Sequence, residues 1–161
     1  MDIQSTAELL GNLGEFIASI AVLITLIYLA VQIKQNTKAM HVTARGHIVE
    51  GTQHLRGLLM NNEFVRGALV KQHRGGELSD EEKLVLRHYT VTMFRNWEYQ
   101  HYQFTNGLVD QDSFRATQVV WRVSLSPYNI KLWPKVRDQF TEVFAQELER
   151  VMAATEKSEE Q

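Results

Sequence analysis

The chain has 161 residues, a formal net charge of −2 and no cysteine. Disulfides, thiolate catalysis and cysteine-based zinc sites are therefore excluded, and the absence of cysteine suits a reducing compartment. The nearly balanced charge provides no basic field for a nucleic acid, so we expect no nucleic-acid partner. Only two prolines, Pro127 and Pro134, occur in a chain that is 44% hydrophobic. This composition favours an all-α fold.

The first element expected along the chain is a membrane helix. Residues 16–33 read FIASIAVLITLIYLAVQI, without a formal charge. As a helix this run spans about 27 Å, close to the roughly 30 Å thickness of a bilayer's hydrocarbon core. Leu13 and Gly14 can lengthen it. We therefore predict an extracytoplasmic segment at 1–12 and a transmembrane helix at 13–34.

Two other interpretations of the apolar run are weaker. A cleaved signal peptide has a basic N-terminal region and a small-residue cleavage site. Here residues 1–15 contain no Lys or Arg, and the run ends in Gln-Ile-Lys. The core helix of a soluble protein usually has only about 10–14 apolar residues in succession.

The flanking charges predict the orientation of the membrane helix. Lys34, Lys38 and Arg45 follow the apolar run, and no basic residue precedes it. By the positive-inside rule the N-terminus lies outside and the remaining chain is cytoplasmic. The same residues, with Arg56, could also contact anionic lipid headgroups, but we prefer the simpler role in topology.

One face of the membrane helix carries mostly small or hydrogen-bonding residues and is called the stripe below. Its members are Ala18, Ser19, Val22, Thr25, Leu29, Gln32 and Asn36, with Glu15 beside its N-terminal end. In lipid, helices associate through close approach and interhelical hydrogen bonds. The stripe therefore predicts a homo-oligomer, or docking on another membrane protein.

Two alternatives for the stripe stay open. The helix could lie alone in lipid, with its hydroxyls bonded to its own carbonyls. The protein could instead be an oligomeric channel or transporter subunit with the stripe facing the lumen, although Val22 and Leu29 interrupt its polarity.

Residues 35–154 are predicted to form a cytoplasmic helical domain. No proline occurs between residues 35 and 126, so we expect the membrane helix to continue as a stalk. Asn62 is expected to cap a helix at 63–72, which ends at Arg74-Gly75-Gly76.

Two further helices have clear start signals. Ser79-x-x-Glu82 is a capping box and predicts a helix to about Thr105, closed by Asn106-Gly107. Asp110 is expected to cap a helix that ends near Leu125. The predicted core face of the first of these helices consists of Leu86, Tyr89, Met93, Trp97 and Phe104, and the second should bury Phe114, Val120 and Trp121.

The C-terminal part is predicted as a turn, a helix and a tail. Residues 126–129, Ser-Pro-Tyr-Asn, read as a turn, and Pro134 suits the first position of a final helix. That helix should present an apolar face of Val136, Phe140, Val143, Phe144, Leu148 and Val151. Residues 155–161 lack apolar side chains and are expected to be disordered. A bundle of four or five helices, with a core containing the three tryptophans, follows.

The stretch LIYLAVQIKQNTKA at 26–39, with Trp97-Glu98, Gly107-Leu108-Val109-Asp110 and Trp133, resembles a family of uncharacterised bacterial single-pass membrane proteins. The resemblance covers most of the chain. It implies one membrane helix followed by a small helical cytoplasmic domain, placed in the bacterial inner membrane. It implies no chemistry.

Glu98 and His101 are the one pair with a metal-site spacing. Di-iron bundles use Glu-x-x-His twice, with two further glutamates, whereas this chain has a single copy. Glu50 and Glu147 could add carboxylates. We prefer a structural polar network that includes Arg95 over a metal or catalytic site.

Three histidines lie along the expected stalk, at His41, His47 and His54. His47 and His54 share a face but lie about 10 Å apart, too far to share one ion. We interpret them as exposed side chains, although copies could meet around an oligomer axis and sense pH.

No catalytic motif such as G-x-S-x-G, a P-loop or H-E-x-x-H occurs. We therefore expect a membrane-anchored interaction or scaffold protein, with no catalytic activity and no cofactor inferred, whose partners are the bilayer and further copies or another membrane protein. The alternatives are a metal-binding or enzymatic module that uses Glu98 and His101, and the channel or transporter subunit.

Overall fold

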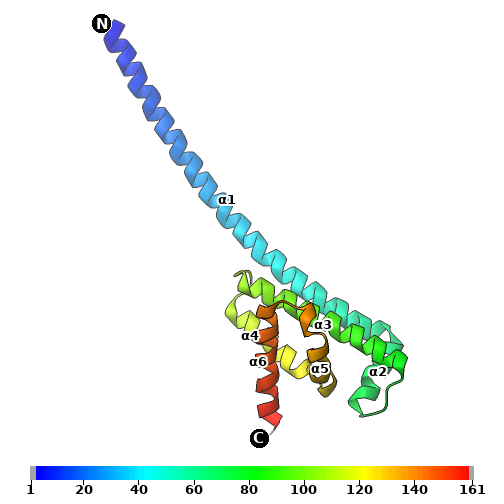
Figure 1. Ribbon diagram of the computed structural model, residues 1–161. Coiled ribbons are helices and arrows are strands. Elements are labelled where there is room, and N and C mark those ends of the chain that lie inside the picture. Colours follow the sequence, from blue (N-terminus) through cyan, green and yellow to red (C-terminus); the bar gives the residue numbers. More distant parts are fainter. Residues whose placement is uncertain (1–2, 160–161) are drawn as a thin grey trace. The chain divides into compact units, whose positions relative to one another are not determined.

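The structure is a computed structural model that describes residues 3–159, and these residues form helices without any strand (Figure 1). The predicted all-α class is confirmed. The elements are α1 (Ile3–Asn61), α2 (Glu63–His73), α3 (Asp80–Thr105), α4 (Gln111–Ser124), α5 (Pro127–Leu132), the 3₁₀ turns η1 (Trp133–Lys135) and η2 (Arg137–Gln139), and α6 (Glu142–Glu159). The chain divides into two compact units, 1–42 and 43–161, and each is described by itself.

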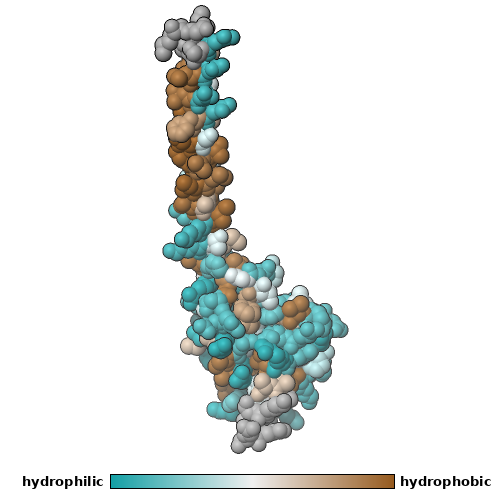
Figure 2. Space-filling model, turned by 90° about the vertical axis from the view of Figure 1, so that its left-hand side faces the viewer, coloured by the Kyte–Doolittle hydropathy of each residue, from teal (hydrophilic) through white to brown (hydrophobic). Residues whose placement is uncertain are grey.

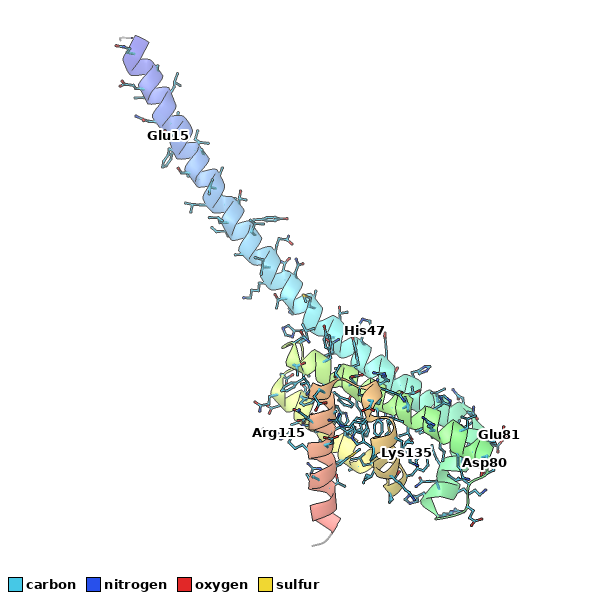
Figure 3. All side chains as sticks on the ribbon, viewed as in Figure 1. Glu15, His47, Asp80, Glu81, Arg115 and Lys135 are labelled. Atoms are coloured by element: carbon cyan, nitrogen blue, oxygen red, sulfur yellow. The ribbon has the colours of Figure 1, made fainter. Side chains whose placement is uncertain are left out.

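The first unit consists of the N-terminal part of α1. The helix is continuous from Ile3 to Asn61, as expected for a membrane helix that continues as a stalk. No proline interrupts it, and all backbone hydrogen bonds of its interior can form within the helix. Glu15 is on this part of α1 (Figure 3).

The second unit begins within α1 and continues through α2 and α3. Asn62 caps α2 by accepting a hydrogen bond from the Val65 backbone N–H at 3.1 Å. The helix ends at His73 with Arg74 as its C-cap, followed by Gly75 with φ of 72°. These predictions for α2 are confirmed.

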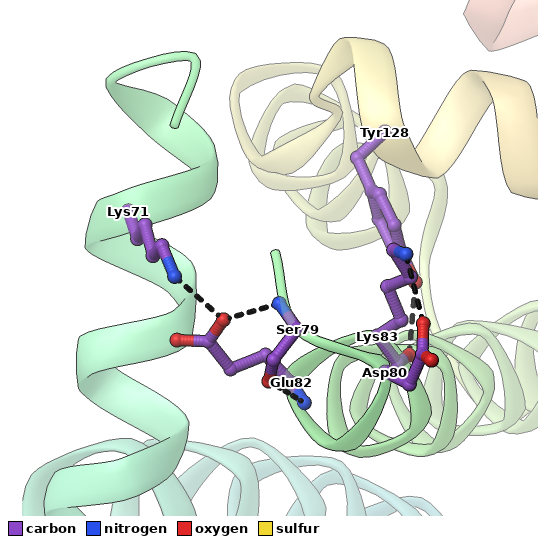
Figure 4. A network of polar contacts seen from close by, with 6 residues as sticks. All are labelled: Lys71, Ser79, Asp80, Glu82, Lys83 and Tyr128. Carbon is purple, nitrogen blue, oxygen red and sulfur yellow. Dashed lines mark hydrogen bonds and ion pairs between the residues drawn. The ribbon is translucent and has the colours of Figure 1, made fainter. Parts of the chain in front are cut away.

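The capping box at the start of α3 is present and also holds α2 (Figure 4). The Ser79 hydroxyl accepts from the Glu82 N–H at 3.2 Å, and the Ser79 N–H donates to the Glu82 carboxylate at 2.7 Å. That carboxylate also accepts a hydrogen bond from the Lys71 ammonium of α2 at 2.8 Å. One glutamate thus caps α3 and ties it to the preceding helix.

The predicted end of α3 and start of α4 are confirmed. Gly107 has φ of 71°, and the Leu108 N–H donates to the Gln103 carbonyl at 2.9 Å. This backbone pattern is a Schellman motif, which favours glycine at its left-handed residue. Asp110 then caps α4 through the Ser113 N–H at 2.9 Å.

Two predictions for the C-terminal part are wrong. Ser126 begins a short helix, α5, rather than a plain turn, because its hydroxyl caps the Asn129 N–H while Pro127 occupies the first turn. Pro134 is the second residue of the 3₁₀ turn η1 and does not start the final helix, which begins only at Glu142.

Aromatic rings fill the core of the second unit. Trp97 and Trp121 stack at a centroid distance of 5.4 Å, and Phe94, Trp133 and Phe144 pack around them. All three tryptophans are buried, as predicted. Leu55 of α1 also belongs to this core.

Two residues that were predicted to be buried are exposed, and the predicted tail is partly helical. Val120 is 49% exposed and Val143 is 64% exposed, so neither belongs to the core. The helix α6 extends to Glu159, which includes the first five residues of the segment 155–161. Residues 160–161 lie outside the described part of the chain.

Candidate functional site

The apolar run of α1 has no covering within the structure. Among the described residues, one helix is long and apolar enough to cross a membrane. Its most apolar window has a mean hydropathy of 2.5, and none of that window is buried. Figure 2 shows apolar residues gathered along this part of α1. Length and composition therefore make α1 the candidate membrane anchor, because water is a poor solvent for such a surface.

The stripe lies on this exposed helix. Ala18, Ser19, Val22, Thr25, Leu29 and Asn36 are exposed, and Gln32 is half-buried. The Ser19 hydroxyl donates to the Glu15 carbonyl and the Thr25 hydroxyl to the Ala21 carbonyl, both at 2.8 Å. Each hydroxyl oxygen still has lone pairs that can accept a hydrogen bond. A second helix could therefore donate to Ser19 and Thr25 without breaking these bonds.

Gln32 is the most polar member of the stripe within the apolar run. Its amide nitrogen donates to the Tyr28 hydroxyl at 3.0 Å, one turn away on the same helix. An amide has two N–H donors and an acceptor oxygen, so this contact leaves hydrogen-bonding capacity for a partner.

Glu98 belongs to a polar network with Arg95 and Thr141. One carboxylate oxygen accepts from the Thr141 N–H at 2.8 Å and from the Thr141 hydroxyl at 3.0 Å. The other oxygen accepts from Arg95 at 2.7 Å. Burial acts most strongly and raises the pKa of the Glu98 carboxyl, but these hydrogen bonds together outweigh it and lower the pKa. Both oxygens are thus engaged by protein donors.

His101 lies one turn further along α3, among aromatic rings. Its ring is 5.8 Å from that of Phe114 and 6.2 Å from that of Phe144, and the residue is 7% exposed. Burial lowers the pKa of the imidazole, while the carboxylates of Glu147 and Glu98 oppose this shift. His101 therefore favours its neutral form near neutral pH.

The carboxylates that could have completed a metal site have other partners. Glu147 accepts hydrogen bonds from Gln118 and from Arg150. Glu50 lies beside His47, with 3.4 Å between Glu50 Oε2 and His47 Nδ1. Within the described residues, no group of three or more His, Asp or Glu side chains could hold a metal ion.

A cleft of about 590 Å³ opens beside Glu98, between α3 and the start of α6. Its walls include Tyr99, His101, Tyr102 and Val143. The Arg95 guanidinium at its edge stacks 4.4 Å from the centroid of the Phe140 ring and is paired with Glu98. Its charged groups are therefore already neutralised by one another, and the cleft presents mainly aromatic and aliphatic surface.

The expected stalk histidines and basic residues are mostly exposed. His47, His54, Lys34 and Lys38 are exposed, and His41 is half-buried. Arg45 is also exposed, and its charge helps to lower the pKa of Asp110, behind the larger effect of the hydrogen bonds from Ser113.

A buried polar chain was not foreseen from the sequence. The Trp121 indole N–H donates to Gln100 at 2.8 Å, and the Gln100 amide donates to Asn96 at 2.6 Å. Asn96 in turn lies against Gly51 of α1, where an added Cβ would be 2.1 Å from its amide nitrogen. Two amide residues four positions apart on α3, Asn96 and Gln100, were the available signal, but periodicity alone does not tell a buried amide from an exposed one.

No protein-family model, curated protein or solved structure matches this chain.

Proposed function

We propose that this protein is a membrane-anchored interaction or scaffold protein that self-associates through its transmembrane helix. The observation that carries the proposal is the long, uncharged and wholly uncovered apolar run of α1, joined to a folded helical domain. A bilayer supplies the apolar surroundings that this run lacks.

The proposed location is the bacterial inner membrane, with the N-terminus outside and the helical domain at 35–154 in the cytoplasm. Lys34 and Lys38 directly follow the apolar run, while residues 1–15 contain no basic residue. The positive-inside rule supports this orientation. The resemblance to bacterial single-pass membrane proteins supports the compartment.

The proposed contact between copies is the stripe. Its alanine, serine and threonine allow close approach of a second helix, and its hydroxyl and amide groups can bond across the contact. The opposite face, with Ile20, Ile24 and Ile27, remains toward lipid. A helix with one small and polar face and one bulky apolar face gains hydrogen bonds and close contact by pairing with a second helix. This favours paired membrane helices over a single helix surrounded by lipid.

The test is the size of the detergent-extracted particle. We expect the double substitution Ser19→Leu with Thr25→Leu to shift the full chain toward the monomer, because bulky side chains keep the helices apart. The matched control, Ile20→Leu with Ile27→Leu, changes the lipid face and should leave the particle size unchanged. An unchanged size for the stripe variant would contradict the proposed contact.

A further inference from the structure

All members of the stripe except Ser19 follow the spacing of a coiled coil. Ala18, Val22, Thr25, Leu29, Gln32 and Asn36 are separated by four, three, four, three and four residues; we call these six residues the seam. Alternation of three and four residues is the heptad repeat in which positions a and d face a partner helix. Ala18, Thr25 and Gln32 then occupy d positions, and Val22, Leu29 and Asn36 occupy a positions.

The seam is one continuous face of a single helix. Residues 18–36 all belong to α1, and the seam residues are exposed except Gln32, which is half-buried. A straight α-helix drifts by about 20° per heptad relative to a 3.5-residue repeat, so two helices keep such a seam in contact by winding around each other with a left-handed twist.

The basic residues near the seam do not oppose a second copy in parallel orientation. Two copies of one chain cross the membrane in the same direction, so each residue faces its equivalent in the partner. Lys34 and Lys38 each follow a seam residue by two positions, which places them about 200° around the helix and away from the contact. Like charges of the two copies are thereby kept apart at the membrane border.

The polar seam residues supply the hydrogen bonds. Gln32 and Asn36 are consecutive d and a positions at the C-terminal end of the apolar run. In a parallel pair, each amide meets the same amide of the other copy and can both donate and accept. An asparagine at an a position is known to fix register and the two-stranded state at some cost in stability.

We propose that the membrane helix forms a parallel, left-handed, two-stranded coiled coil with a second copy of this chain, in which the Gln32 pair and the Asn36 pair face each other. The proposal rests on the proposed function and specifies its partner, orientation and register. Glu15 occupies the a position that precedes Ala18. Like charges would meet there, so the contact begins at Ala18.

Single-cysteine crosslinking tests the register directly, because the chain has no cysteine of its own. One cysteine is placed in turn at each position from 32 to 39 of the full chain, and membranes are oxidised. Ala39, three residues after Asn36, is the next d position of the same repeat. We expect crosslinked dimer to be greatest for Gln32→Cys, Asn36→Cys and Ala39→Cys. Lys34→Cys and Lys38→Cys are matched controls and should give about fivefold less, because a disulfide requires Cβ atoms about 4 Å apart.

The outcomes separate this proposal from the proposed function. Dimers that crosslink best at Ile33 and Thr37, or at Lys34 and Lys38, would overturn the seam while leaving self-association intact. A single cysteine per chain can join only two copies, so the two-stranded state is tested by the size of the detergent-extracted parent chain. An extracted particle larger than a dimer would overturn that state. If no position crosslinks and the extracted particle is a monomer, both proposals fail.

Discussion

Thr141 donates two hydrogen bonds to a single carboxylate oxygen of Glu98, one from its backbone N–H at 2.8 Å and one from its hydroxyl at 3.0 Å. The two residues lie 43 positions apart in the chain. The contact joins the middle of α3 to the residue that precedes α6. Glu98, on α3, therefore acts as a cap for the N-terminal end of α6. Backbone N–H groups at that end have no acceptor within α6 itself, and the Glu98 carboxylate accepts one of them.

Replacement of Glu98 by glutamine should destabilise the domain. Glu98→Gln keeps the shape of the side chain but removes the negative charge that accepts hydrogen bonds from Thr141 and Arg95. We therefore expect a loss of about 1–2 kcal/mol in the free energy of unfolding. Urea unfolding of the full chain in mild detergent, followed by tryptophan fluorescence, measures the loss. All three tryptophans lie in the domain core and report on it. The exposed Glu77→Gln is the control and should change the free energy very little.

The stabilisation by Glu98 should disappear in acid. Its folded-state pKa lies below the ordinary value of 4.5. A lowered carboxyl pKa gives stability that is fully present above the unfolded-state pKa and is lost as the pH falls through the folded-state pKa. The difference in unfolding free energy between the parent chain and Glu98→Gln should therefore be constant down to about pH 4.5 and shrink below it. A difference that grows on acidification would contradict this assignment.

His101 should make the domain less stable in mild acid. Burial lowers its folded-state pKa below the ordinary 6.5. The unfolded chain then takes up a proton first, so stability falls as the pH drops below about 6.5 and continues to fall until the folded-state pKa is reached. We expect His101→Gln to weaken this dependence. Urea midpoints of the two chains between about pH 8 and pH 5 provide the comparison, and parallel curves would show that His101 makes no contribution.

Two glycines of α1 should respond oppositely to alanine. Gly51→Ala would place a methyl group against the Asn96 amide, which Gln100 holds in place, and we expect a loss of about 1–2 kcal/mol. Gly46 has no neighbour within 4 Å. Gly46→Ala should therefore stabilise the protein by up to about 1 kcal/mol through helix propensity alone. Equal effects in thermal unfolding would show that α1 does not approach α3 at Gly51.

The indole N–H of Trp121 should matter more than that of Trp133. Trp121→Phe leaves the Gln100 oxygen without its donor inside the core, with an expected loss of about 2–3 kcal/mol. Trp133 donates a hydrogen bond to the Glu149 carboxylate. This carboxylate also accepts a hydrogen bond from Arg137 and is partly exposed. Trp133→Phe should consequently cost about 1 kcal/mol less than Trp121→Phe. Urea unfolding followed by circular dichroism compares them, and equal losses would contradict the importance of the buried polar chain.

The helix starts were predictable because capping chemistry is local. The side chains of Asn62, Ser79 and Asp110 each accept a backbone N–H three residues ahead, and nothing distant is needed to see this in the sequence. The apolar run of α1 was equally visible. Length and charge alone identify it.

The start of the last helix was not predictable from spacing. Val136, Phe140 and Phe144 recur every four residues and resemble one helical face. However, Val136 lies between the 3₁₀ turns η1 and η2, and Phe140 follows η2. Val136 belongs to the core and Phe140 packs against it. The spacing therefore predicts the burial of these two side chains correctly and their backbone conformation wrongly. The cap that Glu98 provides to Thr141 comes from another helix, and no local signal marks it.

Val120 shows a second limit of sequence patterns. Phe114 and Trp121 are seven residues apart and share the buried face of α4, whereas Val120 is turned by about 100° from Trp121. Apolar character predicted burial there, but no other element covers that side among the described residues.

The central claim, that α1 anchors the chain with its domain in the cytoplasm, is tested most directly by labelling single cysteines with a membrane-impermeant maleimide in intact cells. Gln4→Cys and Arg115→Cys place the thiol before the apolar run and on an exposed site of α4. We predict that Gln4→Cys is labelled in intact cells and that Arg115→Cys is labelled only after the cells are permeabilised. Labelling of Arg115→Cys in intact cells, or recovery of the protein in the soluble fraction without detergent, would contradict the account.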